Sequence, residues 1–127
     1  MALDYGSART GVAVSDPTGT VARPLGVVQK AGAEAGLAEL ARLAREEDVA
    51  RVLVGLPLTM RGTRGEQAAE TERFVESLRG VVDIPVELFD ERFTTDLAQQ
   101  TAGNAPEDAL AAAHLLSTYL EWCAARS

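Results

Sequence analysis

The chain has 127 residues, of which 46% are hydrophobic and 24% are charged. This length suits one compact domain spanning residues 1–127, and the composition excludes a disordered or low-complexity protein. The formal net charge of −7 opposes tight nonspecific binding to a polyanion such as nucleic acid.

The sequence favours a cytoplasmic protein. No apolar run reaches the ~18 residues that a membrane span needs, and the first residues lack the pattern of a signal peptide. Cys123 is the one cysteine, so it cannot form an intramolecular disulfide and has no neighbours for a structural zinc site. We therefore expect no contact with a membrane.

The first thirty residues predict three strands. Residues 2–5 form a short buried strand, residues 6–10 a turn, and residues 11–15 a second strand that completes a hairpin. Residues 21–28 are apolar but contain Pro24, which is typical of an edge strand.

Helices and strands alternate in the rest of the chain. The apolar spacing predicts helices over residues 33–47 and 66–79, buried strands over 51–55 and 84–89, a short helix over 95–101, and a final helix over 106–123. In the final helix, one apolar face is marked by Leu110, Ala113, Leu116 and Leu120. The order βββαβαβα(α) predicts an α/β domain whose mixed sheet begins with antiparallel strands, continues with parallel ones and is flanked by helices.

Acidic residues at strand ends suggest a reactive site. Asp4 ends the first strand and Asp90 and Glu91 end the last, at the edge where open α/β sheets bind ligands, and Asp108 could join them from its helix. Carboxylates gathered in one cleft repel unless they are protonated or bind cations, and a hard divalent ion such as Mg²⁺ suits them. Such a site fits hydrolysis of a phosphodiester by water, with two ions.

Each candidate also has a simpler interpretation. Asp4 could be a turn residue, Glu91 part of a solvated charge cluster, and Asp108 a carboxylate that complements the start of its helix. Phosphate-binding candidates are Arg9, Arg61, Arg64, Arg92 and Thr94. The arginines could equally be ordinary surface residues, and Thr94 could cap a helix.

Three aromatic or basic side chains of the final helix are expected to be structural. His114 has no partner at metal-ligand spacing, so a packed or surface histidine is expected. Tyr119 and Trp122 are interpreted as packing anchors, not as a platform for stacking RNA bases.

Four segments together resemble the YqgF family, also called RuvX or Holliday-junction-resolvase-like, of ribonuclease-H-fold nucleases. They are Leu3-Asp4-Tyr5-Gly6 with residues 9–16, Val54-Gly55-Leu56-Pro57-Leu58 with Gly62 and Gly65, Asp90-Glu91-Arg92-Phe93-Thr94-Thr95, and Asp108 with Ala111, Ala112, Leu115 and Leu116. The resemblance spans nearly the whole chain.

This resemblance implies a ribonuclease-H-like sheet, a cytoplasmic location and a nuclease that matures the 5′ end of pre-16S ribosomal RNA. It implies Asp4, Glu91 and Asp108 as the catalytic residues and as the ligands of Mg²⁺ or Mn²⁺. The expected partner is nucleic acid, RNA in preference to DNA, bound by a monomer or a homodimer.

Two other functions stay open. A resolvase of branched DNA would use the same chemistry on a different substrate. A non-catalytic RNA-binding factor of ribosome assembly is suggested by the net charge and by residues 101–107, which lack the lysines and arginines usual in that loop of the family.

Overall fold

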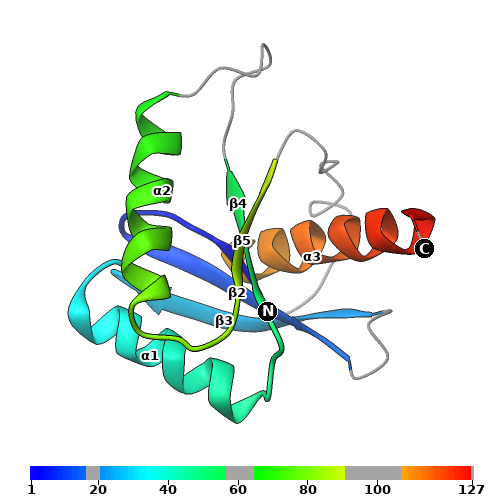
Figure 1. Ribbon diagram of the computed structural model, residues 1–127, viewed down its shortest axis with the longest axis horizontal. Coiled ribbons are helices and arrows are strands. Elements are labelled where there is room, and N and C mark those ends of the chain that lie inside the picture. The colour runs from blue at the N-terminus through cyan, green and yellow to red at the C-terminus, as the bar shows by residue number, and fades with distance from the viewer. Residues whose placement is uncertain (17–20, 57–64, 91–106, 127) are drawn as a thin grey trace.

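A five-stranded mixed sheet forms the centre of the computed structural model (Figure 1). The structure describes residues 1–16, 21–56, 65–90 and 107–126. The strand order is β3-β2-β1-β4-β5, with β1, β2 and β3 antiparallel and β1, β4 and β5 parallel. The mixed α/β architecture predicted from the sequence is therefore confirmed.

The elements follow the predicted order. They are β1 (Ala2–Asp4), β2 (Arg9–Ser15), β3 (Ala22–Gln29), α1 (Glu34–Glu46), β4 (Val52–Leu56), α2 (Glu66–Arg79), β5 (Val86–Asp90) and α3 (Glu107–Arg126). Arg9 and Thr10 begin β2, where a turn was predicted. The short helix predicted over residues 95–101 lies outside the described residues.

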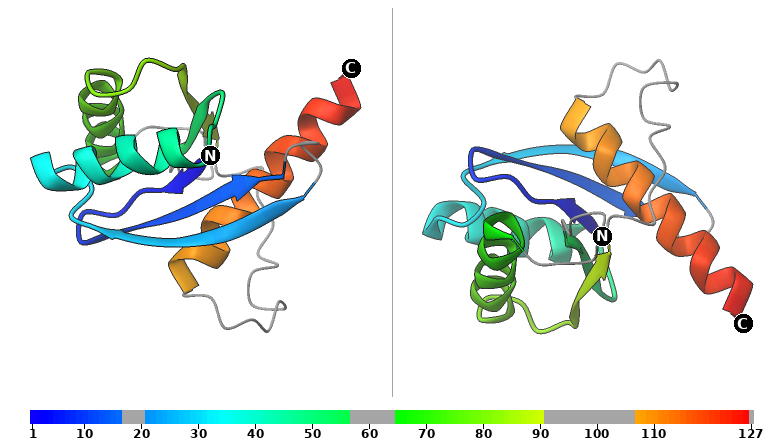
Figure 2. Two further views of the ribbon diagram at one scale, coloured as in Figure 1. Left: turned by 90° about the horizontal axis from the view of Figure 1, so that it is seen from below. Right: turned by 90° about the horizontal axis from the view of Figure 1, so that it is seen from above.

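Helices cover both faces of the sheet. Figure 2 shows α1 and α2 on one face and α3 lying across the other. Between the sheet and α1 and α2 lies an apolar core that includes Leu3, Val12, Leu40 and Phe74. A second core lies under α3, so β4, with Val52, Leu53 and Val54 at 0–2% exposure, is buried on both faces as predicted.

Among the described residues, no helix is long and apolar enough to cross a membrane.

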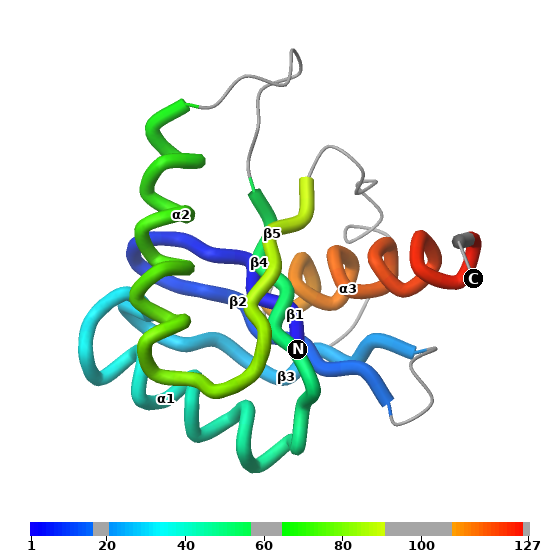
Figure 3. Tube along the Cα trace, in the orientation of Figure 1, coloured from blue at the N-terminus to red at the C-terminus, as the bar shows by residue number. Residues whose placement is uncertain are grey.

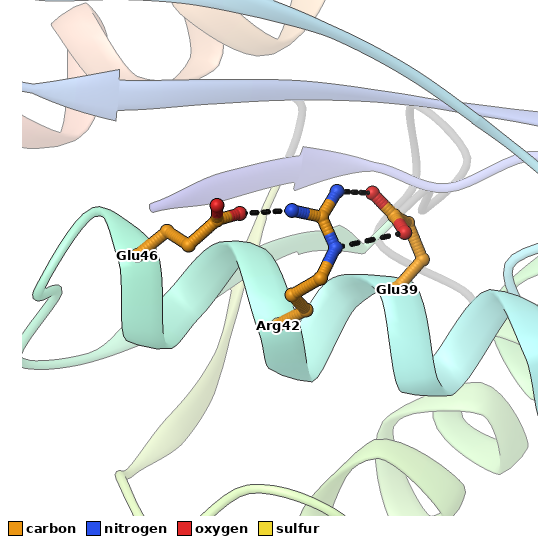
Figure 4. Close-up of polar contacts among 3 residues, drawn as sticks. All are labelled: Glu39, Arg42 and Glu46. Carbon is orange, nitrogen blue, oxygen red and sulfur yellow. Dashed lines mark hydrogen bonds and ion pairs between the residues drawn. The ribbon is translucent and has the colours of Figure 1, made fainter.

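The outer surface of α1 carries charged side chains that pair along the helix. The guanidinium of Arg42 lies between the carboxylates of Glu39 and Glu46, one turn away on either side (Figure 4). Such exposed pairs add only tenths of a kcal/mol each. The helix is held mainly by its opposite face, where Leu40, Ala41 and Ala44 are buried.

The buried face of α3 differs from the predicted one. Of the four residues expected to mark it, only Leu116 is buried, and Leu110, Ala113 and Leu120 are half-buried. The residues that face the sheet include Ala109, Ala112 and Tyr119. Small side chains at 109 and 112 let the start of the helix approach the sheet closely, a requirement that apolar spacing alone does not show.

Pro24 lies in an edge strand, as predicted, and the ladder beside it is irregular. Val12 pairs with Gly26 and Ala13 pairs with Pro24, so Leu25 is an extra residue in β3. Leu25 packs against the core under α1 and α2, on the side where Gly26 offers no side chain. The bulge thus places the Leu25 side chain in this core beside Gly26, which has no side chain.

The helix α3 approaches the sheet very closely at Gly11 of β2. A Cβ atom placed on Gly11 would lie 1.8 Å from the carbonyl oxygen of Asp108. No real Cβ atom tolerates such a distance from a backbone atom, so this position requires glycine for the helix to begin where it does.

We predict that Gly11→Ala destabilises the fold by about 1–3 kcal/mol, because overpacking must push the start of α3 away from β2. Gly26→Ala is the matched control, since a Cβ atom on this strand glycine meets no atom within 4 Å. Urea unfolding followed by circular dichroism measures both. Equal stability of the two variants would contradict the tight contact.

Candidate active site at the carboxyl edge of the sheet

Three parallel strands end at one edge of the sheet. β1 lies beside β4 and β4 beside β5, and their last residues are Asp4, Leu56 and Asp90 (Figure 3). Because parallel strands run in the same direction, their carboxyl ends share this edge. The predicted convergence of the strand ends that carry Asp4 and Asp90 is therefore present.

The register of β1 places Asp4 on the face of the sheet that α3 covers. Asp4 pairs with Gly11, and Ala2 pairs with Ala13. Directly paired residues of antiparallel strands point to the same face. Ala2 and Ala13 both belong to the core under α3, so Asp4, two residues beyond Ala2, points to the same side.

Asp108 meets this site from α3. It is the second residue of the helix, and its backbone lies directly over Gly11, the pairing partner of Asp4. Both acidic residues are half-buried. The structure thus brings two of the three predicted acidic residues to one place, on one face of the sheet.

Arg9 lies beside Asp108. Its Nε atom is 3.2 Å from Oδ2 of Asp108, and the side chains are 63% and 32% exposed. Thr10, which is fully buried, fixes the loop between Asp4 and Arg9, because its Oγ1 donates to the carbonyl of Gly6 and accepts from the N–H of Gly6. The positive charge of Arg9 therefore borders the acidic pair.

The other predicted site residues cannot be placed. Glu91, Arg92 and Thr94 follow β5, and Arg61 and Arg64 precede α2, all outside the described residues. Within the described ranges, no three His, Cys, Asp or Glu side chains form a group that could hold a metal ion. The full acidic triad thus stays a prediction.

A polar pocket adjoins Asp4 on the side of α2. It measures about 230 Å³ and is lined by Asp4, Tyr5, Gly6, Ser7, Gln67, Glu70 and Thr71. Sequence reasoning missed its α2 residues. One face of α2 carries Gln67, Glu70 and Thr71, at the i, i+3, i+4 spacing of a helix. Thr71 is buried although it has a hydroxyl group. Only the fold shows that this face of α2 meets the loop after β1.

Tyr5 links the loop after β1 to α2. Its ring stacks on Phe74 with centroids 4.3 Å apart, and its hydroxyl donates to Oε1 of Glu70 at 3.1 Å. Burial, followed by this bond to the Glu70 carboxylate, raises the pKa of Tyr5 above its ordinary value. The hydroxyl therefore stays a donor at neutral pH.

The aromatic residues of α3 have the predicted packing role. Tyr119 is buried, meets Phe89 edge to face, and stacks on Trp122. Its hydroxyl accepts from Arg51 at 3.0 Å and donates to Glu87 at 3.2 Å, which ties the helix to the sheet. Trp122 remains 42% exposed at the edge of this cluster.

Residues 1–122 match the RuvX family, described as "Holliday junction resolvase". A relative from Chloroflexus aggregans is 43% identical over 95% of this chain and 92% of its own length. Relatives from Chloroflexus aurantiacus and Syntrophomonas wolfei are 42% and 36% identical over 95% of this chain, and over 85% and 92% of their own lengths. All three carry the name "Putative pre-16S rRNA nuclease".

We predict that Asp108→Asn changes the free energy of unfolding by no more than about 1 kcal/mol. The variant loses an exposed ion pair with Arg9 and a charge near a helix start, each worth tenths of a kcal/mol, and relieves repulsion with Asp4. Urea unfolding measures the change. Glu47→Gln, which breaks the similarly exposed pair with Arg23, is the control. A loss well above 1 kcal/mol would show that Asp108 is needed for folding.

Proposed function

This chain belongs to the RuvX family, and from that membership we propose that it is a metal-dependent nuclease that hydrolyses phosphodiester bonds of pre-16S ribosomal RNA, near the 5′ end of the mature molecule. The names of its relatives support the substrate. A pre-ribosomal substrate would put the protein in the cytoplasm.

The observation that carries the proposal is the meeting of Asp4 and Asp108 across Gly11. Folding brings together two carboxylates from residues about a hundred positions apart in the sequence, at the edge where α/β sheets bind ligands. Two carboxylates held on one face of the sheet suit a site for a cation.

The carboxylate oxygens of the candidate site are suitable ligands for a divalent cation. Carboxylate oxygens are the ligands preferred by Mg²⁺ and Mn²⁺, and we assign Asp4, Glu91 and Asp108 as the residues that would hold one or two such ions. When bound, the metal supplies an activated water and neutralises charge that develops on the phosphate. Half-burial of Asp4 and Asp108 limits the screening of their charges by solvent.

Arg9 fits a contact to the substrate backbone. Its side chain is 63% exposed and lies beside Asp108, so it can reach a phosphate placed over the acidic pair. Arg61, Arg64, Arg92 and Thr94 are further candidates in the segments that flank the site. Contacts of this kind fix the strand without reading its sequence.

A cleavage assay tests the proposal, with single-stranded RNA, duplex RNA that carries a pre-16S 5′ flank, and a four-way DNA junction. We expect RNA to be cut with Mg²⁺ or Mn²⁺ and not with EDTA. Asp4→Asn should lower the rate by about 100-fold or more, since even outer residues of metal sites contribute 10–100-fold.

The other outcomes decide between the remaining functions. Cutting of the DNA junction alone would favour the resolvase. Binding of RNA without cleavage under any metal would favour the non-catalytic assembly factor. Glu47→Gln, far from the acidic pair, is the control for general damage.

A second prediction concerns Arg9 as a competitor for the metal. Because its guanidinium lies beside Asp108, Arg9→Gln should tighten Mg²⁺ binding severalfold, seen as a larger rise in melting temperature at a given Mg²⁺ concentration. Arg23→Gln removes an arginine of similar exposure that pairs with Glu47 and should leave the Mg²⁺ response unchanged. An unchanged response in Arg9→Gln would separate Arg9 from the metal site.

A further inference from the structure

The polar pocket between the loop after β1 and the first turns of α2 has the size and chemistry of a sugar site. Its volume of about 230 Å³ is several times that of a water molecule, about 30 Å³ in the liquid. Asp4 forms part of its wall, so an occupant would lie directly beside Asp4.

The charges of the pocket disfavour a phosphate. Glu70 contributes a carboxylate, Asp4 adjoins it, and among the described residues that line the pocket none is a lysine or an arginine. The remaining polar groups are the Ser7 hydroxyl, the Gln67 amide and Thr71, whose hydroxyl donates to the Gln67 carbonyl at 2.8 Å. The occupant that fits is a neutral group with hydroxyl donors.

Glu70 is the acceptor best placed for such a hydroxyl. From the described part of the chain, its carboxylate accepts a hydrogen bond from the Tyr5 hydroxyl, at Oε1. A carboxylate accepts up to about four hydrogen bonds, so Glu70 keeps capacity for a donor in the pocket. Because the Tyr5 ring stacks on Phe74, the position of the Tyr5 hydroxyl that bonds to Glu70 is fixed.

We propose that this pocket binds the ribose next to the scissile phosphate and that Glu70 accepts a hydrogen bond from its 2′-hydroxyl. This assignment rests on the nuclease function proposed above. The 2′-hydroxyl is the group by which a protein distinguishes RNA from DNA at a given position. Glu70 is then a specificity-determining residue for RNA, and Tyr5 is a positioning residue that acts through Glu70.

The preference for RNA has a physical origin in the acceptor capacity that Glu70 keeps beside its hydrogen bond from Tyr5. A site built to bind a hydroxyl rejects the analogue that lacks it, because the polar group of the protein is left without its partner. A hydrogen bond to a charged group in a half-open pocket corresponds to a discrimination of about tenfold.

The test compares the affinities of one single-stranded sequence made as RNA and as DNA. The titrations use Mg²⁺ and protein carrying Asp108→Asn, which is expected to prevent cutting and lies outside the pocket. In this background we expect RNA to bind about tenfold more tightly than DNA. Adding Glu70→Ala should bring the ratio close to one by weakening RNA binding.

Two further variants separate the hydroxyl contact from general charge effects. Glu66→Ala removes the same charge one turn earlier on α2, outside the pocket, so it should strengthen the binding of both polymers without changing their ratio. Tyr5→Phe keeps the stack on Phe74 but removes the donor to Glu70, and an intermediate ratio is expected. RNA with 2′-fluoro groups, which cannot donate a hydrogen bond, should bind like DNA.

The outcomes distinguish this proposal from the nuclease function. If RNA is cleaved but Glu70→Ala keeps the RNA-to-DNA ratio of the parent, the pocket assignment is overturned and the nuclease stands. If the ratio falls with Glu70→Ala but no substrate is ever cleaved, the nuclease proposal fails and the ribose contact stands. An equal affinity of the parent for RNA and DNA also overturns the pocket assignment.

Discussion

The contact between Gly11 and the first turn of α3 is the constraint on which the site depends. With no side chain at position 11, the backbone of Asp108 lies directly on β2, at the residue that pairs with Asp4. Ala109 and Ala112, both fully buried, continue the close approach along the helix. The positions of both carboxylates are thus set by packing of backbone against backbone, which is less adaptable than contacts between long side chains.

Asp4 separates two environments with different chemistry. On the side of α3, Arg9 compensates part of the negative charge of Asp108. On the side of α2, the described residues that line the pocket with Asp4 are uncharged apart from Glu70, which accepts a hydrogen bond from Tyr5. A nucleotide could place its charged phosphate on the first side and its neutral sugar on the second. The two sides of one residue would then recognise two parts of the same substrate.

Much of the fold could be predicted because hydrophobic periodicity reports burial directly. The helix over residues 66–79 was predicted with its observed bounds, and Pro24 identified an edge strand. The buried face of α3 was predicted only in part, because Leu116 is buried as expected but the close contact at Gly11 places Ala109 and Ala112, not Leu110, against the sheet. Of the candidate site, Asp4 and Asp108 were suggested by strand ends and helix position, and their role stays a prediction. Glu70 was not suggested, since a glutamate on a helix surface looks solvated until the loop of Tyr5 is folded against it.

The irregular pairing of β3 bears on how the molecule avoids self-association. Pro24 has no N–H to offer a new strand, and the extra residue Leu25 breaks the regular row of backbone groups along that margin of the sheet. At the opposite margin, Arg79 donates to the carbonyl of Val86 at 2.8 Å and occupies an acceptor that an incoming strand would need. Both edge strands therefore carry features that resist the templated strand addition that leads to aggregation, so this small acidic protein can keep a largely buried sheet without closing it into a barrel.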